Sequence, residues 1–155
     1  MIERADYQVT IERTGPKEGL ATSIASGLPP LAVASPPEFG GPEGEWSPEH
    51  LLVAAVGSCF LTTYLAIADA SHLEIVDLSV PGEGTIERGD DRRYRFTRIV
   101  LRPRIVLERE ADRDRALRIS LKAEGACLVT RSLASEVVVE PQFKVLEESP
   151  AAVPC

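Results

Sequence analysis

The cysteines are the side chains of this sequence best suited to chemistry. Three are present, Cys59, Cys127 and Cys155, with no C-x-x-C pair and only two histidines, so neither a disulfide scaffold nor a thiolate metal site is expected. Cys127 follows Gly125 at a predicted helix start, where the helix dipole stabilises a thiolate. From placement alone we expect Cys127 to be the more acidic thiol and Cys59 the more buried one. Cys155 ends a proline-rich tail, and no catalytic role is assigned to it.

Cys59 lies in the strongest helix signal of the chain. Ser47 is a good N-cap, Pro48 suits the first helical position, and Glu49 is an acid in the first turn. The stretch Leu51–Ala68 then carries no charge. A helix apolar on every face spans a membrane or lies at the centre of a core. Polar residues in its middle and acidic flanks favour the core helix, so no membrane partner is expected.

The remaining pattern predicts strands, helix, strands, helices and a strand, an α+β order. The expected strands are Tyr7–Thr14, Leu20–Ala25, Leu31–Ala34, Ile75–Glu87, Arg93–Leu107 and Glu136–Leu146. Pro81 and Pro103 indicate bulges or edge positions. The expected later helices are Asp112–Glu124, with an apolar face of Ala116, Leu117, Ile119 and Leu121, and Ala126–Ala134.

Length and charge restrict the function classes. The 155 residues predict one domain over residues 1–148 with a flexible tail at 149–155. A net charge of −7 and an aromatic content of 5% disfavour a nucleic-acid partner. Eleven arginines lie between Arg88 and Arg118, but acids interrupt them, which indicates a solvated face. The charged N-terminus lacks an apolar segment, so we expect a cytoplasmic protein.

Two motifs together resemble the OsmC/Ohr family of thiol-dependent peroxidases. They are PPEFGGPEGEWSPEHLLVAAVGSCF, which ends beside Cys59, and EGACLVTRSL around Cys127. The resemblance implies an OsmC-like α+β fold, with antiparallel sheets around two long central helices in an intertwined homodimer. It also implies that Cys59 is the peroxidatic thiol, Cys127 the resolving thiol, and Glu49 the acid at the start of the helix.

The implied chemistry needs no cofactor and no metal. A Cys59 thiolate attacks the O–O bond of a small organic hydroperoxide, and the resulting sulfenic acid condenses with Cys127 to a disulfide. An external dithiol, of lipoyl or another type, then reduces that disulfide. Apolar neighbours of Cys59 suit an organic peroxide: Leu52, Val56, Phe60 and Tyr64.

A cation near Cys59 is expected, because burial alone raises the pKa of a thiol. The family carries an arginine in the N-terminal hairpin that pairs with the glutamate. In this chain the candidates there are Lys17 and Arg13. The alternative to the enzyme is a binding module or a redox sensor that uses the same dimer cleft. A peroxidase requires the cation near Cys59, whereas a binding module does not.

Glu49 and Cys59 are expected on one continuous helix. Ten residues correspond to about 15 Å along the axis, so Glu49 cannot act beside its own Cys59. The simplest shared site places Glu49 of one subunit at Cys59 of the other. His50 is expected as a surface or capping residue, and Trp46 either lines the mouth of the site or is buried.

Overall fold

The computed structural model describes residues 3–14 and 20–146, which fall into two compact units, Met1–Leu52 and Val53–Cys155. The prediction of a single domain stays a prediction. The expected flexible tail at 149–155 and Lys17 lie outside the described residues.

The first unit contains a three-stranded antiparallel sheet. Its strands are β1 (Thr10–Arg13), β2 (Ala21–Ile24) and β3 (Leu31–Val33), all shorter than the alternation predicts. A 3-10 turn, η1 (Pro37–Phe39), follows, and Gly41 donates its N–H to Pro36 O at 3.1 Å. A Cβ on Gly41 would lie 1.6 Å from Ser35 O, so this loop requires a glycine there.

The second unit contains three long strands, each interrupted at a proline. The predicted strand Ile75–Glu87 is β4 (Ile75–Ser79) and β5 (Gly82–Arg88), and Arg93–Leu107 is β6 (Tyr94–Leu101) and β7 (Arg104–Leu107). The last is β8 (Glu136–Val139) and β9 (Gln142–Val145). The breaks contain Pro81, Pro103 and Pro141, because a proline has no N–H for the ladder.

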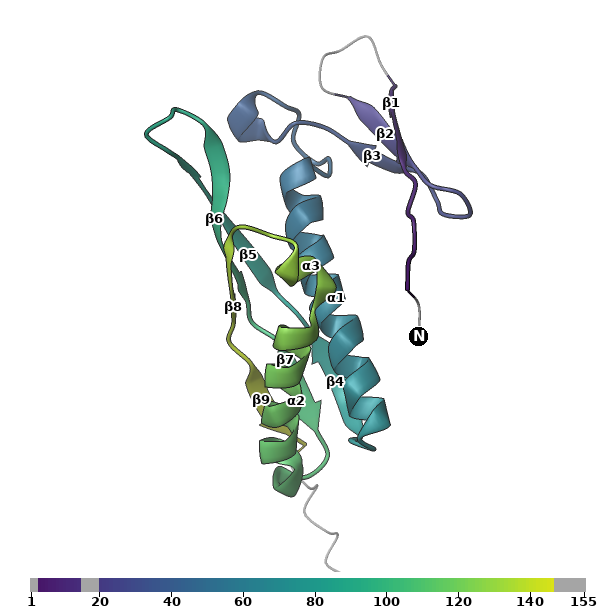
Figure 1. The fold of residues 1–155 in the computed structure, drawn as a ribbon, viewed down its shortest axis with the longest axis vertical. Coiled ribbons are helices and arrows are strands. Elements are labelled where there is room, and N and C mark those ends of the chain that lie inside the picture. Colours follow the sequence, from purple (N-terminus) through teal and green to yellow (C-terminus); the bar gives the residue numbers. More distant parts are fainter. Residues whose placement is uncertain (1–2, 15–19, 147–155) are drawn as a thin grey trace, which may run out of the picture. The chain divides into compact units, whose positions relative to one another are not determined.

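The breaks leave two short sheets, ordered β4-β7-β9 and β5-β6-β8 (Figure 1). The expectation of antiparallel sheets is wrong for one pairing in each: β6–β8 and β7–β9 are parallel. Backbone hydrogen bonds continue across the breaks, from Arg102 N–H to Pro81 O at 2.8 Å and from Gln142 N–H to Pro103 O at 2.7 Å. The proline breaks of the three strands therefore lie side by side, and hydrogen bonding between the strands continues across them.

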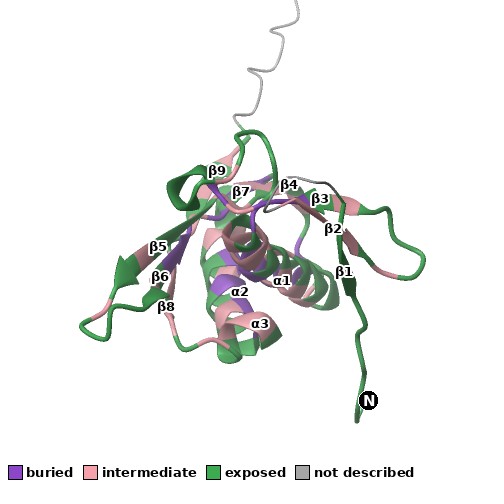
Figure 2. Ribbon diagram, turned by 90° about the horizontal axis from the view of Figure 1, so that it is seen from above, coloured by how far each residue is buried: buried purple, intermediate pink, exposed green. Residues whose placement is uncertain are grey.

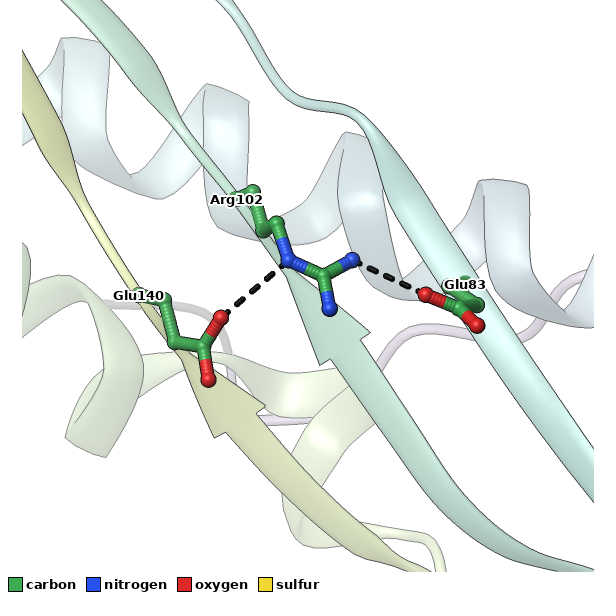
Figure 3. A network of polar contacts seen from close by, with 3 residues as sticks. All are labelled: Glu83, Arg102 and Glu140. Carbon is green, nitrogen blue, oxygen red and sulfur yellow. Dashed lines mark hydrogen bonds and ion pairs between the residues drawn. The ribbon is translucent and has the colours of Figure 1, made fainter.

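Arg102 clamps the three strands together at these breaks (Figure 3). Its Nη1 donates to Glu83 Oε2 at 3.0 Å and its Nε donates to Glu140 Oε2 at 3.1 Å. Hydrogen bonding to Glu83 raises the pKa of Arg102. The arginine thus joins β5 to the segment that follows β8 across the central strand. Acids similarly pair with Arg98, Arg109 and Arg113, as expected for a solvated face.

Helix α1 (Pro48–Ala70) packs one face against the core of the second unit (Figure 2). Its most deeply buried residues recur about every four positions, the spacing of one helix face. They are Val56, Phe60, Tyr64 and Ala68. The core also takes residues from β6, β7 and α2 (Arg113–Ala126). Tyr64 is fully buried, and its hydroxyl donates to Ala116 O at 3.4 Å, which joins α1 to α2.

The opposite face of α1 stays open in the single chain, contrary to the expectation of a helix buried all round. Leu65 is 42% exposed, and Ala55 and Ala66 are exposed as well. By length and composition α1 is apolar enough to cross a membrane, with 28% of its 18-residue window of highest hydropathy buried. One stripe of α1 is nonetheless part of the core that the helix forms with strands and α2.

The second helix differs from the expectation in length and orientation. The chain has one long helix of 23 residues, α1, whereas α2 has 14, so a second long helix is not found within the described chain. Ala116 and Ile119 face the core as predicted, but Leu117 and Leu121 are 42% and 60% exposed. Gly125 does not break α2, which ends at Ala126. The predicted helix over Ala126–Ala134 is a single turn, α3 (Leu128–Arg131).

Candidate active site

The start of α1 is capped as the sequence predicts. Ser47 is buried, and its Oγ accepts the His50 N–H at 3.2 Å, the side-chain cap that the first turn needs. The same Oγ lies 2.9 Å from His50 Nδ1, and the Trp46 ring stands edge-on to the His50 ring at 6.3 Å. Gly44, Glu45, Trp46 and His50 line an open hollow of about 250 Å³. His50 is therefore an exposed residue held by the cap, and Trp46 is about half exposed.

Glu49 presents an unusual carboxylate. Its side chain is half-buried. Its Oε2 is inaccessible to solvent and has no hydrogen-bond partner among the described residues. A buried carboxylate oxygen normally has a partner, because desolvation without one is costly. Glu49 and Cys59 lie on the same continuous helix, as expected.

The structure brings Cys59 and Cys127 together in the second unit, although 67 residues separate them in the chain. Both are free thiols, and their side chains hydrogen-bond to one another. Cys127 is fully buried and caps α3, whereas Cys59 is half-buried on α1. The expectation that Cys59 is the more buried thiol is therefore wrong. Its position beside Phe60 leaves it at the edge of the buried stripe rather than within it.

The order of acidity is also the reverse of the expectation. Burial raises the pKa of Cys59, but four hydrogen bonds outweigh it and leave that pKa below its ordinary value. They come from the Cys127 side chain, the Val129 and Leu128 backbone N–H groups, and the Thr63 side chain. Two free amides at the start of α3, those of Leu128 and Val129, thus act on Cys59, although Cys127 is the residue at the cap position.

Cys127 is correspondingly the weaker acid. Burial raises its pKa, and the hydrogen bond to Cys59 raises it further because Cys127 donates its S–H to the Cys59 thiolate. Thr130 acts in the other direction, through its side chain and its backbone. Its Oγ1 donates to Cys127 Sγ at 3.1 Å. The interaction between the two thiols thus lowers the pKa of Cys59 and raises that of Cys127, so Cys59 is the one that ionises first.

Thr63 and Thr130 are residues of this site that sequence reasoning missed. Their spacing is a signal that was available: Thr63 lies four residues after Cys59 within α1, and Thr130 lies three residues after the cap Cys127. Residues three and four apart share a helix face. A hydroxyl at such a position lies within reach of the sulfur.

Several predicted site residues lie elsewhere. Val56, Phe60 and Tyr64 belong to the core, and burial raises the pKa of Tyr64 to about 12. Leu52 is half-buried at the end of the first unit. Arg13 ends β1 in the first unit and Lys17 is not described, so neither is placed against Cys59. Among the described residues, no cation contributes to the lowered pKa of Cys59.

Three features define this domain. They are a long helix that carries one thiol, a second thiol at the cap of a later helix turn, and two three-stranded sheets formed by strands that are interrupted at prolines. Residues 40–142 match the protein family described as OsmC-like protein. The chain belongs to the OsmC-like protein family. This membership confirms the resemblance found in the two cysteine motifs.

Known proteins resemble the chain in sequence or in fold, at low sequence identity. The uncharacterized protein YmaD of Bacillus subtilis is 28% identical over 79% of this chain and 83% of its own length. An OsmC-like protein of unknown function from Vibrio cholerae has a TM-score of 0.81 at 19% identity, covering 90% of this chain and 100% of its own. An organic hydroperoxide resistance protein, OsmC, from Legionella pneumophila has a TM-score of 0.70 at 22% identity, covering 92% and 100%. At these identities the solved structures establish the OsmC-like α+β fold.

Proposed function

We propose that the protein is a thiol-dependent peroxidase that reduces small organic hydroperoxides. The observation that carries the proposal is the hydrogen-bonded pair of Cys59 and Cys127, whose pKa values are displaced in opposite directions. A peroxidatic thiol must be a thiolate near neutral pH, and a resolving thiol must lie within reach of it. Family membership supports the same chemistry, since some relatives by fold are named organic hydroperoxide resistance proteins.

The reaction assigns a role to each sulfur. The Cys59 thiolate attacks the terminal, hydroxyl-bearing oxygen of the peroxide, the O–O bond breaks to leave a Cys59 sulfenic acid, and the alkoxide takes a proton from water and leaves as an alcohol. Cys127 then displaces the oxygen of the Cys59 sulfenic acid as water and forms a disulfide. An external dithiol reduces that disulfide and completes the cycle.

Donor groups of the protein take over part of the role expected of a cation. Backbone N–H groups of Leu128 and Val129 stabilise the Cys59 thiolate without a charged side chain. Hydrogen bonds to the charged form of an acid lower its pKa just as a nearby opposite charge does. Lys17 or Arg13 remains the proposed partner of Glu49 rather than a requirement for an acidic Cys59.

An apolar peroxide fits the side chain next to the thiol. The Leu128 backbone donates to Cys59, and the Leu128 side chain is 69% exposed. An exposed leucine whose backbone donates to the reacting sulfur favours an alkyl hydroperoxide over hydrogen peroxide, because contact with the alkyl group would remove apolar surface from water.

The direct test adds tert-butyl hydroperoxide to the reduced protein and measures free thiols and intact mass. We expect the loss of two thiols and a disulfide between Cys59 and Cys127. Cys59→Ser should abolish peroxide consumption, whereas Cys127→Ser should allow one turnover and stop at an oxidised Cys59. Cys155→Ser is the matched control and should behave as the parent. Unchanged thiols in excess peroxide would refute the proposal.

We further propose a homodimer whose active sites are shared between subunits. The open apolar face of α1 is surface that a second copy would cover, and the buried, unpartnered Oε2 of Glu49 is a group that a site would use. The axial separation of about 15 Å within α1 prevents Glu49 from reaching its own Cys59. Mixing Glu49→Ala and Cys59→Ser proteins under subunit exchange tests this arrangement. Recovery of activity is expected, and a mixture no more active than its components, with exchange verified by mass spectrometry, would contradict it.

A redox sensor or a binding module in the same cleft is the alternative function. The observation in its favour is that no cation of the described residues acts on Cys59. A sensor would form the disulfide but turn over slowly with every dithiol tested, and a binding module would keep both thiols reduced. Steady-state turnover with dihydrolipoamide and with dithiothreitol therefore separates the three functions.

A further inference from the structure

Thr130 is a polar residue beside Cys127 that the proposed reaction does not use. Its Oγ1 donates a hydrogen bond to Cys127 Sγ at 3.1 Å, within a part-buried pair three residues apart. Cys127 is fully buried, so its sulfur cannot rely on water for solvation. The Thr130 hydroxyl and backbone, together with Cys59, are the polar groups that act on Cys127.

We propose that Thr130 is a positioning residue that activates Cys127 for the second step, the attack on oxidised Cys59. The hydroxyl holds the sulfur in place and stabilises the negative charge that develops on it. This inference rests on the proposed function for its role in turnover, whereas the interaction itself does not depend on any peroxide.

Oxidation of Cys59 changes the balance of forces on Cys127. In the reduced pair, burial raises the pKa of Cys127, and the charge and hydrogen bond of Cys59 raise it further. A sulfenic acid is neutral, so the contribution of the Cys59 charge disappears once Cys59 has reacted. The contribution of Thr130 remains and lowers the pKa. Cys127 therefore keeps its proton during the first step and becomes easier to ionise for the second.

The step balances without a further reactant. The electron pair of Cys127 Sγ forms the S–S bond to Cys59 Sγ, and the S–O bond of the sulfenic acid breaks. The departing hydroxide combines with the proton released by Cys127 to give water, and both sulfurs end in the disulfide.

The charged groups around Cys127 do not compete with this assignment. Cys59 on α1 is the titratable group whose charge acts on Cys127. Glu124 and Arg131 are the nearest charged residues along the chain, and neither is among the groups that shift the pKa of Cys127.

The first experiment titrates Cys127 alone. In a Cys59→Ser, Cys155→Ser background Cys127 is the one remaining cysteine of the chain, and its ionisation is followed by thiolate ultraviolet absorbance. We expect Thr130→Val to raise the midpoint by about one pH unit, the size expected for a lost hydrogen bond to a charged sulfur. Thr130→Ser, which keeps the hydroxyl, should titrate as the parent.

A matched control removes another hydroxyl from the same helix turn. Ser132 Oγ donates to Leu128 O at 3.0 Å and is exposed, so Ser132→Ala perturbs α3 without touching the sulfur. Its midpoint should equal that of the parent. Equal midpoints for Thr130→Val and the parent would overturn the proposal. Equal shifts for Thr130→Val and Thr130→Ser would also overturn it, because the hydroxyl would then not be the cause.

The second experiment follows turnover in the chain with all three cysteines. After one equivalent of tert-butyl hydroperoxide, Thr130→Val should form the disulfide about three- to tenfold more slowly than the parent at pH 7, whereas Ser132→Ala should form it at the parent rate. Sulfenic acid trapped by dimedone should accumulate, and raising the pH should restore the rate. An unchanged disulfide rate contradicts the role of Thr130. If the parent does not consume peroxide, the proposed function fails while the titration result stands.

Discussion

The hydrogen bond from Cys127 to Cys59 predicts that the resolving cysteine also controls the reactivity of the other thiol. Replacing Cys127 by alanine removes the donor that contributes most to lowering the pKa of Cys59. The hydrogen bond favours the charged form, so its loss must raise the pKa of Cys59. At a pH below that value the thiolate fraction then falls, and the reaction with any electrophile slows.

The magnitude follows from the kind of bond that is lost. An S–H is a weak donor, but the acceptor is charged, which gives a contribution on the order of 1–2 kcal/mol. Since 1.36 kcal/mol corresponds to about one pKa unit, the midpoint of Cys59 should rise by about one unit. The backbone donors of Leu128 and Val129 and the Thr63 hydroxyl remain, so the thiol should stay more acidic than a buried thiol without partners.

The assay measures the rate of Cys59 alkylation by iodoacetamide against pH in a Cys155→Ser background, with the modified peptide identified by mass. Cys127→Ala should shift the profile to higher pH, and Cys127→Ser, which supplies an O–H donor of similar size, should shift it less. A Cys127→Ala profile that is unchanged or moved to lower pH would refute the assignment of Cys127 as the donor.

Three further variants test the fold around the site. Gly84→Ala should destabilise the protein by about 1–3 kcal/mol in urea unfolding, because the new Cβ would lie 2.6 Å from Phe96 Cε1 and 2.7 Å from Val53 Cγ2. An unaltered urea midpoint would contradict this packing. Gly125→Ala should stabilise the protein by about 0.5–1 kcal/mol, because the position is helical and no neighbouring atom lies within 4 Å of the new Cβ. A lower stability of this variant would mean that the position is not helical in solution. Arg102→Met should lower the unfolding temperature slightly, with a difference that shrinks in high salt, and a difference that persists in salt would show that the clamp acts through packing.

The sequence was sufficient to predict the elements that depend on local signals. Ser47 and Pro48 mark the start of α1, and the cap forms as expected because its partners lie within one turn. The two long strand regions were also predicted in place. Their division at Pro81 and Pro103 follows from the missing N–H of proline, whereas the parallel pairing of the last strand depends on the return path of the chain. No local pattern encodes that path.

The order of the thiols could not be predicted from local placement. Cys127 does lie at a helix start, as the sequence suggests, and the Thr130 backbone lowers its pKa, but burial and the interaction with Cys59 outweigh this effect. The Leu128 and Val129 amides act on Cys59, which comes from a helix far away in the sequence. The start of α3 is therefore a source of thiolate stabilisation, as its sequence indicates, but the sulfur that it makes more acidic is Cys59.

The packing of the core explains why the amides reach Cys59. The buried stripe of α2 runs through Ala116, Ile119 and Ala123 and, four residues further on, leads to Cys127. Phe60, the neighbour of Cys59, lies in the buried stripe of α1, and the hydrogen bond from Tyr64 to α2 joins the two helices. Cys127 thus continues a core stripe and Cys59 lies at the edge of one, so both sulfurs are held by the contacts that stabilise the second unit. Their relative position, and with it the displacement of the two pKa values, is a property of the packed core rather than of a flexible loop.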